Sequence, residues 1–254
     1  MKGATAQQRY YWLCLAGRAA AFLMLVILAL AAPARFLTDL EGRTLSPLLL
    51  VWLLLMLAMV RQLFPSRLKS PGSQKIFARR CLPSSGGVSR EEIRQADQGA
   101  LRVLLVWAAA HAGIFFLYAH QVVGKRFLVC LAGFYGVCDL ICVLIFCPFR
   151  AWLMHNRCCT TCRIYDWDYL MMCTPLLPVG GWMAVSACGL ALLLFLRWEL
   201  VWRRHPERFL ESGNRALGCS ACEGHLCQYR RGLKRRLRRA TPSAARVADD
   251  PAGE

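Results

Sequence analysis

Long uninterrupted apolar segments are the feature of this 254-residue sequence that most restricts its fold. About 20 consecutive apolar residues cross the hydrocarbon core of a bilayer as a helix, and the backbone polar groups there must be paired within the chain. Such segments lie at residues 11–32, 47–64, 101–123, 127–149 and 169–202. The sequence therefore predicts an all-α protein, a polytopic bundle of five or six transmembrane spans joined by short polar loops.

The first apolar segment has an alternative interpretation as a secretory signal peptide. A basic start, an apolar stretch and small residues at 31–34 follow one another, as in a leader sequence. We prefer a retained span, because the segment is long and further spans follow it. The third and fourth segments are separated only by residues 124–126, so we expect them to form a tight antiparallel hairpin.

The polar stretch between the second and third segments, residues 65–99, is predicted to be mostly loop. It contains proline and glycine pairs that are typical of turns. Near its end, Ser89 is followed three residues later by Glu92, the spacing of a capping box at the start of a helix. We therefore expect a short helix to lead into the third span.

The last segment, residues 169–202, decides between five and six spans. It is too long for one ordinary span and short for two, and the prolines and glycines within 175–181 should break or kink a helix. A turn there gives six spans and places the N-terminus, the loops 61–102 and 150–163 and the C-terminal tail on one side. That side carries most of the basic residues, which makes it cytoplasmic. We prefer six spans, in the cell inner (plasma) membrane, with a cytoplasmic tail.

Most of the formal net charge of +17 lies outside the apolar segments. It can act through topology and through attraction to anionic lipid headgroups. No nucleic-acid-binding motif accompanies the charge, so we expect no nucleic-acid partner. The tail 203–240 is basic and contains cysteines, and residues 230–239 would form either a short amphipathic helix on the membrane or a solvated stretch. Residues 241–254 have the composition of a disordered C-terminus.

Fourteen cysteines are present, and six of them are clustered in polar parts of the chain. The other eight lie mostly in apolar segments, where packing is the simplest role for a cysteine. The first cluster follows the fourth span and the second lies in the tail. Their members are Cys158, Cys159 and Cys162, and Cys219, Cys222 and Cys227.

Each cluster contains a Cys-x-x-Cys pair, and two such pairs complete a tetrahedral metal site if they share a membrane face, as six spans allow. We predict Cys159, Cys162, Cys219 and Cys222 as ligands, with Cys158, Cys227, His155 and His225 as substitutes. Zinc suits four thiolates, and so does an iron–sulfur cluster. A reversible dithiol–disulfide pair and incidental thiols are the alternatives.

Two carboxylates follow the first cysteine cluster, at Asp166 and Asp168. Positions i and i+2 do not share a helix face, so the spacing supports an acid–base pair only weakly. Alternatively, these acids pair with Arg157 or Arg163 and fix the loop. The neighbouring aromatic residues suit an interfacial belt at the membrane boundary: Tyr165, Trp167 and Tyr169.

Three ionisable residues lie within apolar segments: Arg18, His111 and Asp139. Such groups are costly in a bilayer and are therefore candidates for a proton or substrate path. A structural hydrogen-bonded pair is the alternative.

The loop NRCCTTCRIYDWD, residues 156–168, resembles the signature of a family of uncharacterised bacterial multi-pass membrane proteins. The tail sequence RHPERF, residues 204–209, and the CxxCxxxxC spacing that follows resemble the ending of the same family. The likeness covers roughly residues 150–230. That family has no assigned activity, so the resemblance implies that the two cysteine clusters belong together and implies no reaction.

Three functions follow from these observations. The first is a membrane protein whose two cysteine clusters form one cytoplasmic metal centre, structural or redox. The second is a transporter-like protein built around the three intramembrane ionisable residues. The third is a non-enzymatic adaptor whose basic tail and cysteine loop (residues 156–168) bind a protein partner. The sequence leaves open whether the chain is an enzyme.

Overall fold

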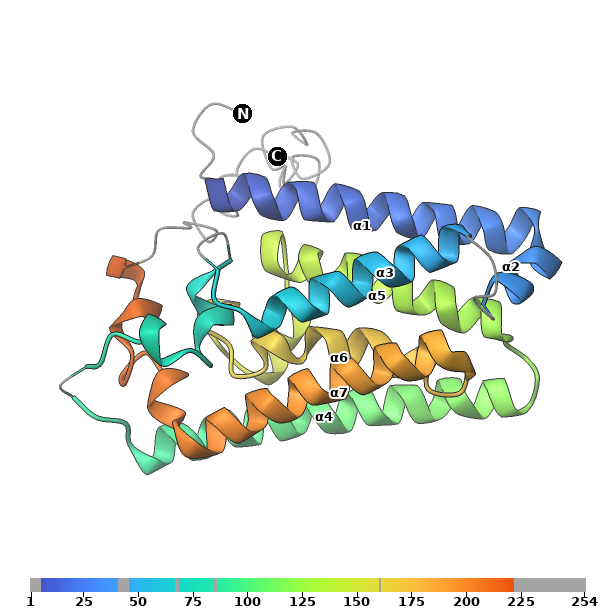
Figure 1. Cartoon of the computed structure of the whole chain (residues 1–254). Helices are drawn as coiled ribbons and strands as arrows, with labels where there is room; N and C mark the ends of the chain where they lie inside the picture. Colours follow the sequence, from blue (N-terminus) through green and yellow to red (C-terminus); the bar gives the residue numbers. More distant parts are fainter. Residues whose placement is uncertain (1–5, 41–45, 67–68, 85, 160, 222–254) are drawn as a thin grey trace, which may run out of the picture.

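The computed structural model describes residues 6–40, 46–66, 69–84, 86–159 and 161–221, and these residues form helices and turns without a β-strand (Figure 1). Cys222, His225 and Cys227, and the C-terminal residues for which disorder is predicted, lie outside the described residues. Four helices are long and apolar enough to cross a membrane: α1 (Ala6–Ala31), α4 (Arg90–Ala119), α5 (Lys125–Leu144) and α7 (Gly181–Arg204). The all-helical, membrane-type architecture is thereby confirmed.

The outer faces of these helices carry large apolar side chains. Leu30 of α1 is 78% exposed, for example. A water-soluble protein rarely exposes such continuous apolar surface, whereas lipid tails solvate it. Residues that contribute are Leu13, Leu23, Ile27, Leu104, Leu105, Phe127, Phe134, Leu192, Leu193 and Leu196.

Two helices begin at serine caps. The shorter apolar helix α3 (Pro47–Val60) starts with Ser46, whose Oγ accepts a hydrogen bond from the Leu49 N–H at 3.3 Å. At α4, the Ser89 Oγ accepts from the Glu92 N–H at 3.1 Å, and the Glu92 carboxylate accepts from the Ser89 N–H at 3.0 Å. The predicted capping box is confirmed, and it starts α4 well before the apolar segment at 101–123.

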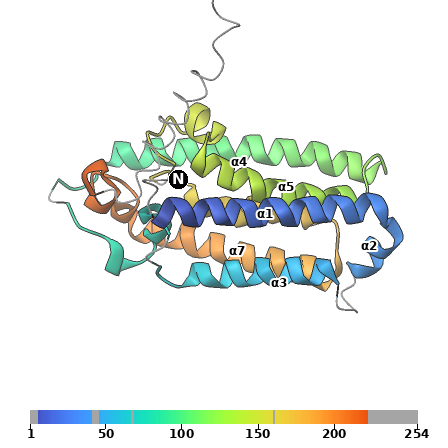
Figure 2. The ribbon, with the colours of Figure 1, turned by 90° about the horizontal axis from the view of Figure 1, so that it is seen from above.

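The helices pack as two pairs joined by a short helix. α1 packs along α5, α3 packs along α7, and α6 (Asp168–Cys173) contacts both α5 and α7. Figure 2, seen from the α1 side, shows α3 and α7 on one side of α1 and α5 on the other. The helix α2 (Pro33–Asp39) covers one end of the bundle, and α4 lies on the face opposite α1 (Figure 1).

The segment 169–202 contains a chain reversal rather than one long helix. After α6 and the 3-10 turn Thr174–Leu176, Gly180 and Gly181 adopt φ values of 72° and 81°, in the left-handed region that favours glycine. The Tyr118 hydroxyl donates to the Pro178 carbonyl at 3.3 Å, so the reversal lies beside the end of α4. The chain then returns through α7, and the cysteine loop and residues 205–221 lie at the same end of the bundle (Figure 1).

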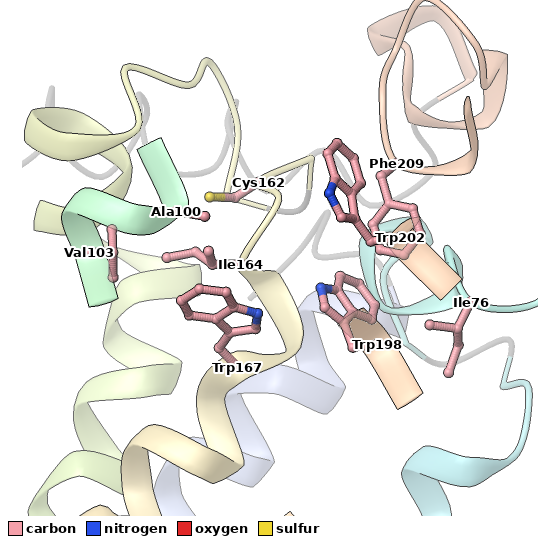
Figure 3. Close-up of a cluster of buried hydrophobic side chains, with 9 residues drawn as sticks. All are labelled: Ile76, Ala100, Val103, Cys162, Ile164, Trp167, Trp198, Trp202 and Phe209. Atoms are coloured by element: carbon pink, nitrogen blue, oxygen red, sulfur yellow. The ribbon is translucent and has the colours of Figure 1, made fainter. Parts of the chain in front are cut away.

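Residues 205–221 fold back onto the bundle instead of forming a solvated tail. Phe209 is 1% exposed, and its ring packs edge-on against Trp198 and Trp202, with centroids 4.7 and 5.3 Å apart (Figure 3). An isolated bridge between Pro83 and Asn214 ties this segment to the loop before α4. The first part of the predicted tail is therefore a packed element.

Gly213 tests this packing. A Cβ there would lie 2.5 Å from the Glu207 carbonyl oxygen and 2.7 Å from the Val88 side chain. We expect Gly213→Ala to destabilise the docked segment by about 1–3 kcal/mol, the usual effect of overpacking. Trypsin cleavage at Arg208 and Arg215 should become faster. Gly86→Ala, where a Cβ meets nothing within 4 Å, is the control. Equal cleavage of both variants would contradict the docked arrangement.

Candidate functional site

A cavity of about 510 Å³ lies between the α1–α5 and α3–α7 pairs. This volume is typical of small-molecule pockets. Its walls are mostly apolar, with contributions from Phe22, Leu25, Leu48, Val51, Leu55, Val129 and Ala184. Ionisable and amide side chains line the remainder: Arg18, Arg61, Gln62, Lys69, Asp139, Asp166 and Asp168. The cavity therefore offers an apolar chamber with a strongly polar lining near the cysteine loop.

Two of the three intramembrane ionisable residues meet in this cavity. The Arg18 guanidinium lies 2.7 Å from the Asp139 carboxylate and also donates to the Gly136 carbonyl at 2.8 Å. Close packing of α1 on α5 makes the pair possible, because a Cβ at Gly133 would already lie 3.1 Å from the Leu25 side chain. A buried ion pair with an added hydrogen bond is tolerated in an apolar interior, whereas one lone charge is not.

His111 is not part of this pair. Its Nδ1 hydrogen-bonds with the Trp107 carbonyl at 3.0 Å, within its own helix, and its ring packs against Trp107 and Tyr135. The Nε2 atom is buried without a hydrogen-bond partner among the described residues. A path through all three predicted residues is therefore not assembled, and the His111 side chain lies outside the cavity lining.

Asp166 and Asp168 line the cavity where α6 begins. One carboxylate oxygen of each is buried without a hydrogen-bond partner in the described part of the chain. Burial, followed by the negative charge of Asp168, holds the pKa of Asp166 well above its usual range. Lys69, whose ammonium donates to the Gln62 side chain, opposes this shift only partly. Asp166 therefore retains its proton at a higher pH than an ordinary aspartate does.

The arginine of this loop has other partners than the two aspartates. Arg163 is 5% exposed and binds both oxygens of Glu199 on α7, at 2.7 and 2.6 Å. Its Nε lies 3.5 Å from Asp97 of α4. The predicted pairing of Arg163 with Asp166 or Asp168 is wrong, because Glu199 and Asp97 supply the compensating charges.

The aromatic residues of the loop are interior residues. Trp167 and Tyr169 are each 5% exposed, so the prediction of an interfacial belt is wrong for them. The Tyr165 hydroxyl hydrogen-bonds with the Tyr11 hydroxyl at 3.0 Å and accepts from the Ser70 Oγ at 3.0 Å. These contacts join α1, the loop before α4 and the cysteine loop at the polar end of the cavity.

Lys75 is a buried cation that the sequence did not reveal. It is 1% exposed, its ammonium donates to the Cys162 carbonyl at 2.8 Å, and it lies 5.8 Å from the ring centroids of Trp198 and Phe209. Burial lowers the pKa of Lys75 to about 8. In the sequence it is one lysine in a polar loop, and no local pattern marks it.

The predicted metal ligands are dispersed. Cys162 packs among the apolar side chains of Figure 3, whereas Cys219 is exposed and accepts a hydrogen bond from Arg157 at 3.3 Å. In the described ranges, no three His, Cys, Asp or Glu side chains are grouped so as to hold a metal ion. These residues do not fit a zinc or iron–sulfur site as they stand, and the four-cysteine centre stays a prediction that depends on Cys222 outside those ranges.

Cys159 instead joins two cysteines that sequence reasoning had assigned to packing. Its thiol donates to the Cys142 carbonyl at 3.2 Å, and the thiols of Cys142 and Cys159 both hydrogen-bond with Cys147. These contacts, with the Arg150 N–H at 3.4 Å, lower the pKa of Cys147. We call Cys142, Cys147 and Cys159 the thiol cluster. The signal in the sequence was Pro148, which places Cys147 beyond the end of the helix.

The ion pair in the cavity predicts a stability effect. We expect Arg18→Gln or Asp139→Asn to lower the free energy of unfolding by about 2 kcal/mol, because each leaves the other, half-buried charge unpaired inside an apolar part of the protein. The loss of unfolding free energy in the double variant should be smaller than the sum of the losses in the two single variants. Unfolding in mixed detergent micelles measures this, with Arg94→Gln, from the exposed Arg94–Glu91 pair, as control. Additive losses would contradict a direct interaction.

Lys75 predicts a pH dependence. Between pH 8 and the ordinary lysine value near 10.4, the unfolded chain binds more protons at this position than the folded chain does. Stability contributed by Lys75 should therefore rise as the pH increases through this window. The difference in apparent melting temperature between wild type and Lys75→Met should shift in favour of wild type from pH 7 to pH 10. The Lys125→Met variant, at an exposed lysine, should show no such trend. A melting-temperature difference between wild type and Lys75→Met that does not change with pH would contradict the lowered pKa of Lys75.

No family model, curated protein or solved structure matches this chain. The resemblance of the cysteine loop and tail to an uncharacterised bacterial family accordingly stays a prediction. The cavity and its charged lining are the basis on which a function is proposed.

Proposed function

We propose that this chain is a membrane carrier that binds an amphiphilic amine in the cavity and exchanges it for a proton held by Asp166 and Asp168. The observation that carries the proposal is the buried oxygen without a hydrogen-bond partner on each of these carboxyls, beside an apolar chamber of about 510 Å³. This develops the transporter-like hypothesis with a different set of residues.

The apolar walls favour a ligand with a hydrocarbon part. Phe22, Leu25 and Val51 contribute surface on which an alkyl or aromatic group can be buried, and each buried methylene contributes about 0.8 kcal/mol. The polar lining favours a head group at one end of the same molecule. An amphiphile satisfies both parts of the cavity at once.

The distribution of hydrogen bonds favours a positively charged head. Two of the three cationic groups in the lining are engaged by other side chains, Arg18 by Asp139 and Lys69 by Gln62. Among the buried polar atoms of the cavity lining, one oxygen each of Asp166 and Asp168 has no hydrogen-bond partner in the described residues. An ammonium group supplies three donors and a compensating charge, whereas a carboxylate or phosphate head would add to the repulsion.

The raised pKa of Asp166 supports coupling to protons. Asp168, Asp139, Lys69 and Lys75 are the charged groups that influence it, and burial outweighs the two lysines. Burial keeps a proton on the pair, and a bound ammonium stabilises the ionised form and releases that proton. Binding and proton release are then two parts of one exchange.

The membrane arrangement that accompanies this proposal has six crossings, with α3 and the α6 limb as the two short ones. The end that carries the cysteine loop is assigned to the cytoplasm of the plasma membrane, because Arg79, Arg80, Arg203 and Arg204 gather in its loops and helix end. These residues would also attract anionic lipid headgroups. The polar end of the cavity then faces the cytoplasm.

Three probes with the same alkyl chain test the head group: dodecylamine, dodecanol and dodecanoate. With the full chain in lipid nanodiscs, we expect dodecylamine to bind about tenfold or more tightly than dodecanol, since hydrogen bonds to charged groups contribute about 1.5–3 kcal/mol. Its affinity should rise as the pH increases towards the pKa of the carboxyl pair and then level off, with proton release in weakly buffered solution. Calorimetry measures affinity and proton release together.

Matched variants identify the carboxyls. Asp166→Asn and Asp168→Asn should lose the preference for the amine while keeping the weaker binding of dodecanol. Glu211→Gln removes an exposed carboxylate of the docked segment and should bind all three probes as wild type does. Equal affinity for the three head groups, or an unchanged amine preference in both asparagine variants, would overturn the proposal.

A further inference from the structure

The thiol cluster is chemically separate from the carboxyl-lined cavity. Cys142, Cys147 and Cys159 do not line the cavity. They come from the last turn of α5, from the chain just after it and from the cysteine loop. All three sulfurs are thiols in the structure. We propose that this cluster is a redox-active site in which Cys147 forms a disulfide with Cys142 or Cys159 when a peroxide oxidises it.

The central position of Cys147 carries the proposal. Its sulfur takes part in hydrogen bonds with the thiols of both neighbours, so that either one is already close to it. The Arg150 N–H also donates to this sulfur, at 3.4 Å. A disulfide forms only when two sulfurs can approach without large backbone movement, and the hydrogen-bond contacts place a candidate partner sulfur next to Cys147 on two sides.

The surroundings hold the neighbours in place. The Cys159 thiol donates to the Cys142 carbonyl at 3.2 Å, which joins the cysteine loop to the end of α5. The Cys162 N–H donates to the Cys159 carbonyl at 3.1 Å, and Arg150 donates to the Asn156 carbonyl at 2.9 Å. Cys159 is 5% exposed, whereas Cys147 is half-buried and is the more accessible attacking group.

The reaction is balanced with hydrogen peroxide as the oxidant. The Cys147 sulfur attacks one peroxide oxygen, the O–O bond breaks, and the departing hydroxide leaves as water after it gains a proton. The resulting sulfenic acid is attacked by the neighbouring thiol, the S–O bond breaks, and a second water leaves with the proton of that thiol. Two thiols are oxidised by two electrons in total, peroxide is reduced to two waters, and an added dithiol reverses the change.

Peroxide titration of the full chain in detergent micelles tests the site. Thiols are blocked with one maleimide before reduction and with an isotopically heavy one after it, and the peptides are analysed by mass spectrometry. Within wild-type protein, we expect Cys147 to be oxidised about tenfold faster than the half-buried Cys81. Hydrogen-bond donors beside a sulfur favour the reactive thiolate, and Cys147 has such donors. A reversible crosslink between Cys147 and one of its two neighbours should appear at the same rate.

Variants separate the partners. Cys147→Ser should abolish the crosslink, and Cys142→Ser with Cys159→Ser together should stop the reaction at a sulfenic acid that dimedone traps. Cys81→Ser is the matched control and should react as wild type does. The comparison of Cys147 with Cys81 in the wild-type chain remains decisive if a variant fails to fold. Oxidation of Cys147 no faster than that of Cys81, or a crosslink that excludes Cys147, would overturn the proposal.

Discussion

One buried guanidinium, that of Arg163, fixes the polar end of the molecule. It binds both carboxylate oxygens of Glu199 on α7 and lies 3.5 Å from Asp97 on α4. Trp167 and Trp202 donate to the same two acids at 2.8 Å each. A charge with 5% exposure is tolerated only while its partners stay in place, so α4, α7 and the cysteine loop are held together as one unit.

The loop fixed in this way carries both chemical features of the protein. Cys159 precedes Arg163, and Asp166 and Asp168 follow it, so the thiol cluster and the carboxyl end of the cavity lie on either side of one anchor. The Lys75 ammonium binds the loop's backbone at the Cys162 carbonyl and restrains it further. The positions of the reactive groups therefore depend on contacts made by residues that have no chemical role themselves.

Features that depend on neighbours in the sequence could be predicted, and features that depend on distant partners could not. Some features depend only on residues close together in the sequence: the apolar segments, the Ser89 cap and the glycines of the reversal. They can therefore be predicted from the sequence without knowing the fold. The rule that intramembrane charges need partners indicated Arg18 and Asp139, but the face of α4 that His111 occupies depends on packing. Cys147 lies beside Cys159 only because the cysteine loop folds back onto α5. No periodic pattern in the sequence predicts that contact.

The cavity between α1 and α3 requires a physical reason to persist, because protein interiors are close-packed and a void loses dispersion contacts. If the walls were entirely apolar, closing the cavity would add dispersion contacts and stabilise the protein. Closure here would bring the Arg18–Asp139 pair and the Asp166 and Asp168 carboxyls into a drier environment, where oxygens without hydrogen-bond partners are most costly. The charged lining thus opposes the collapse that the apolar walls favour. A ligand with an apolar body and a donor-rich head would fill the space between the apolar walls and supply hydrogen bonds to the carboxyls. This links the shape of the cavity to the chemistry proposed for it.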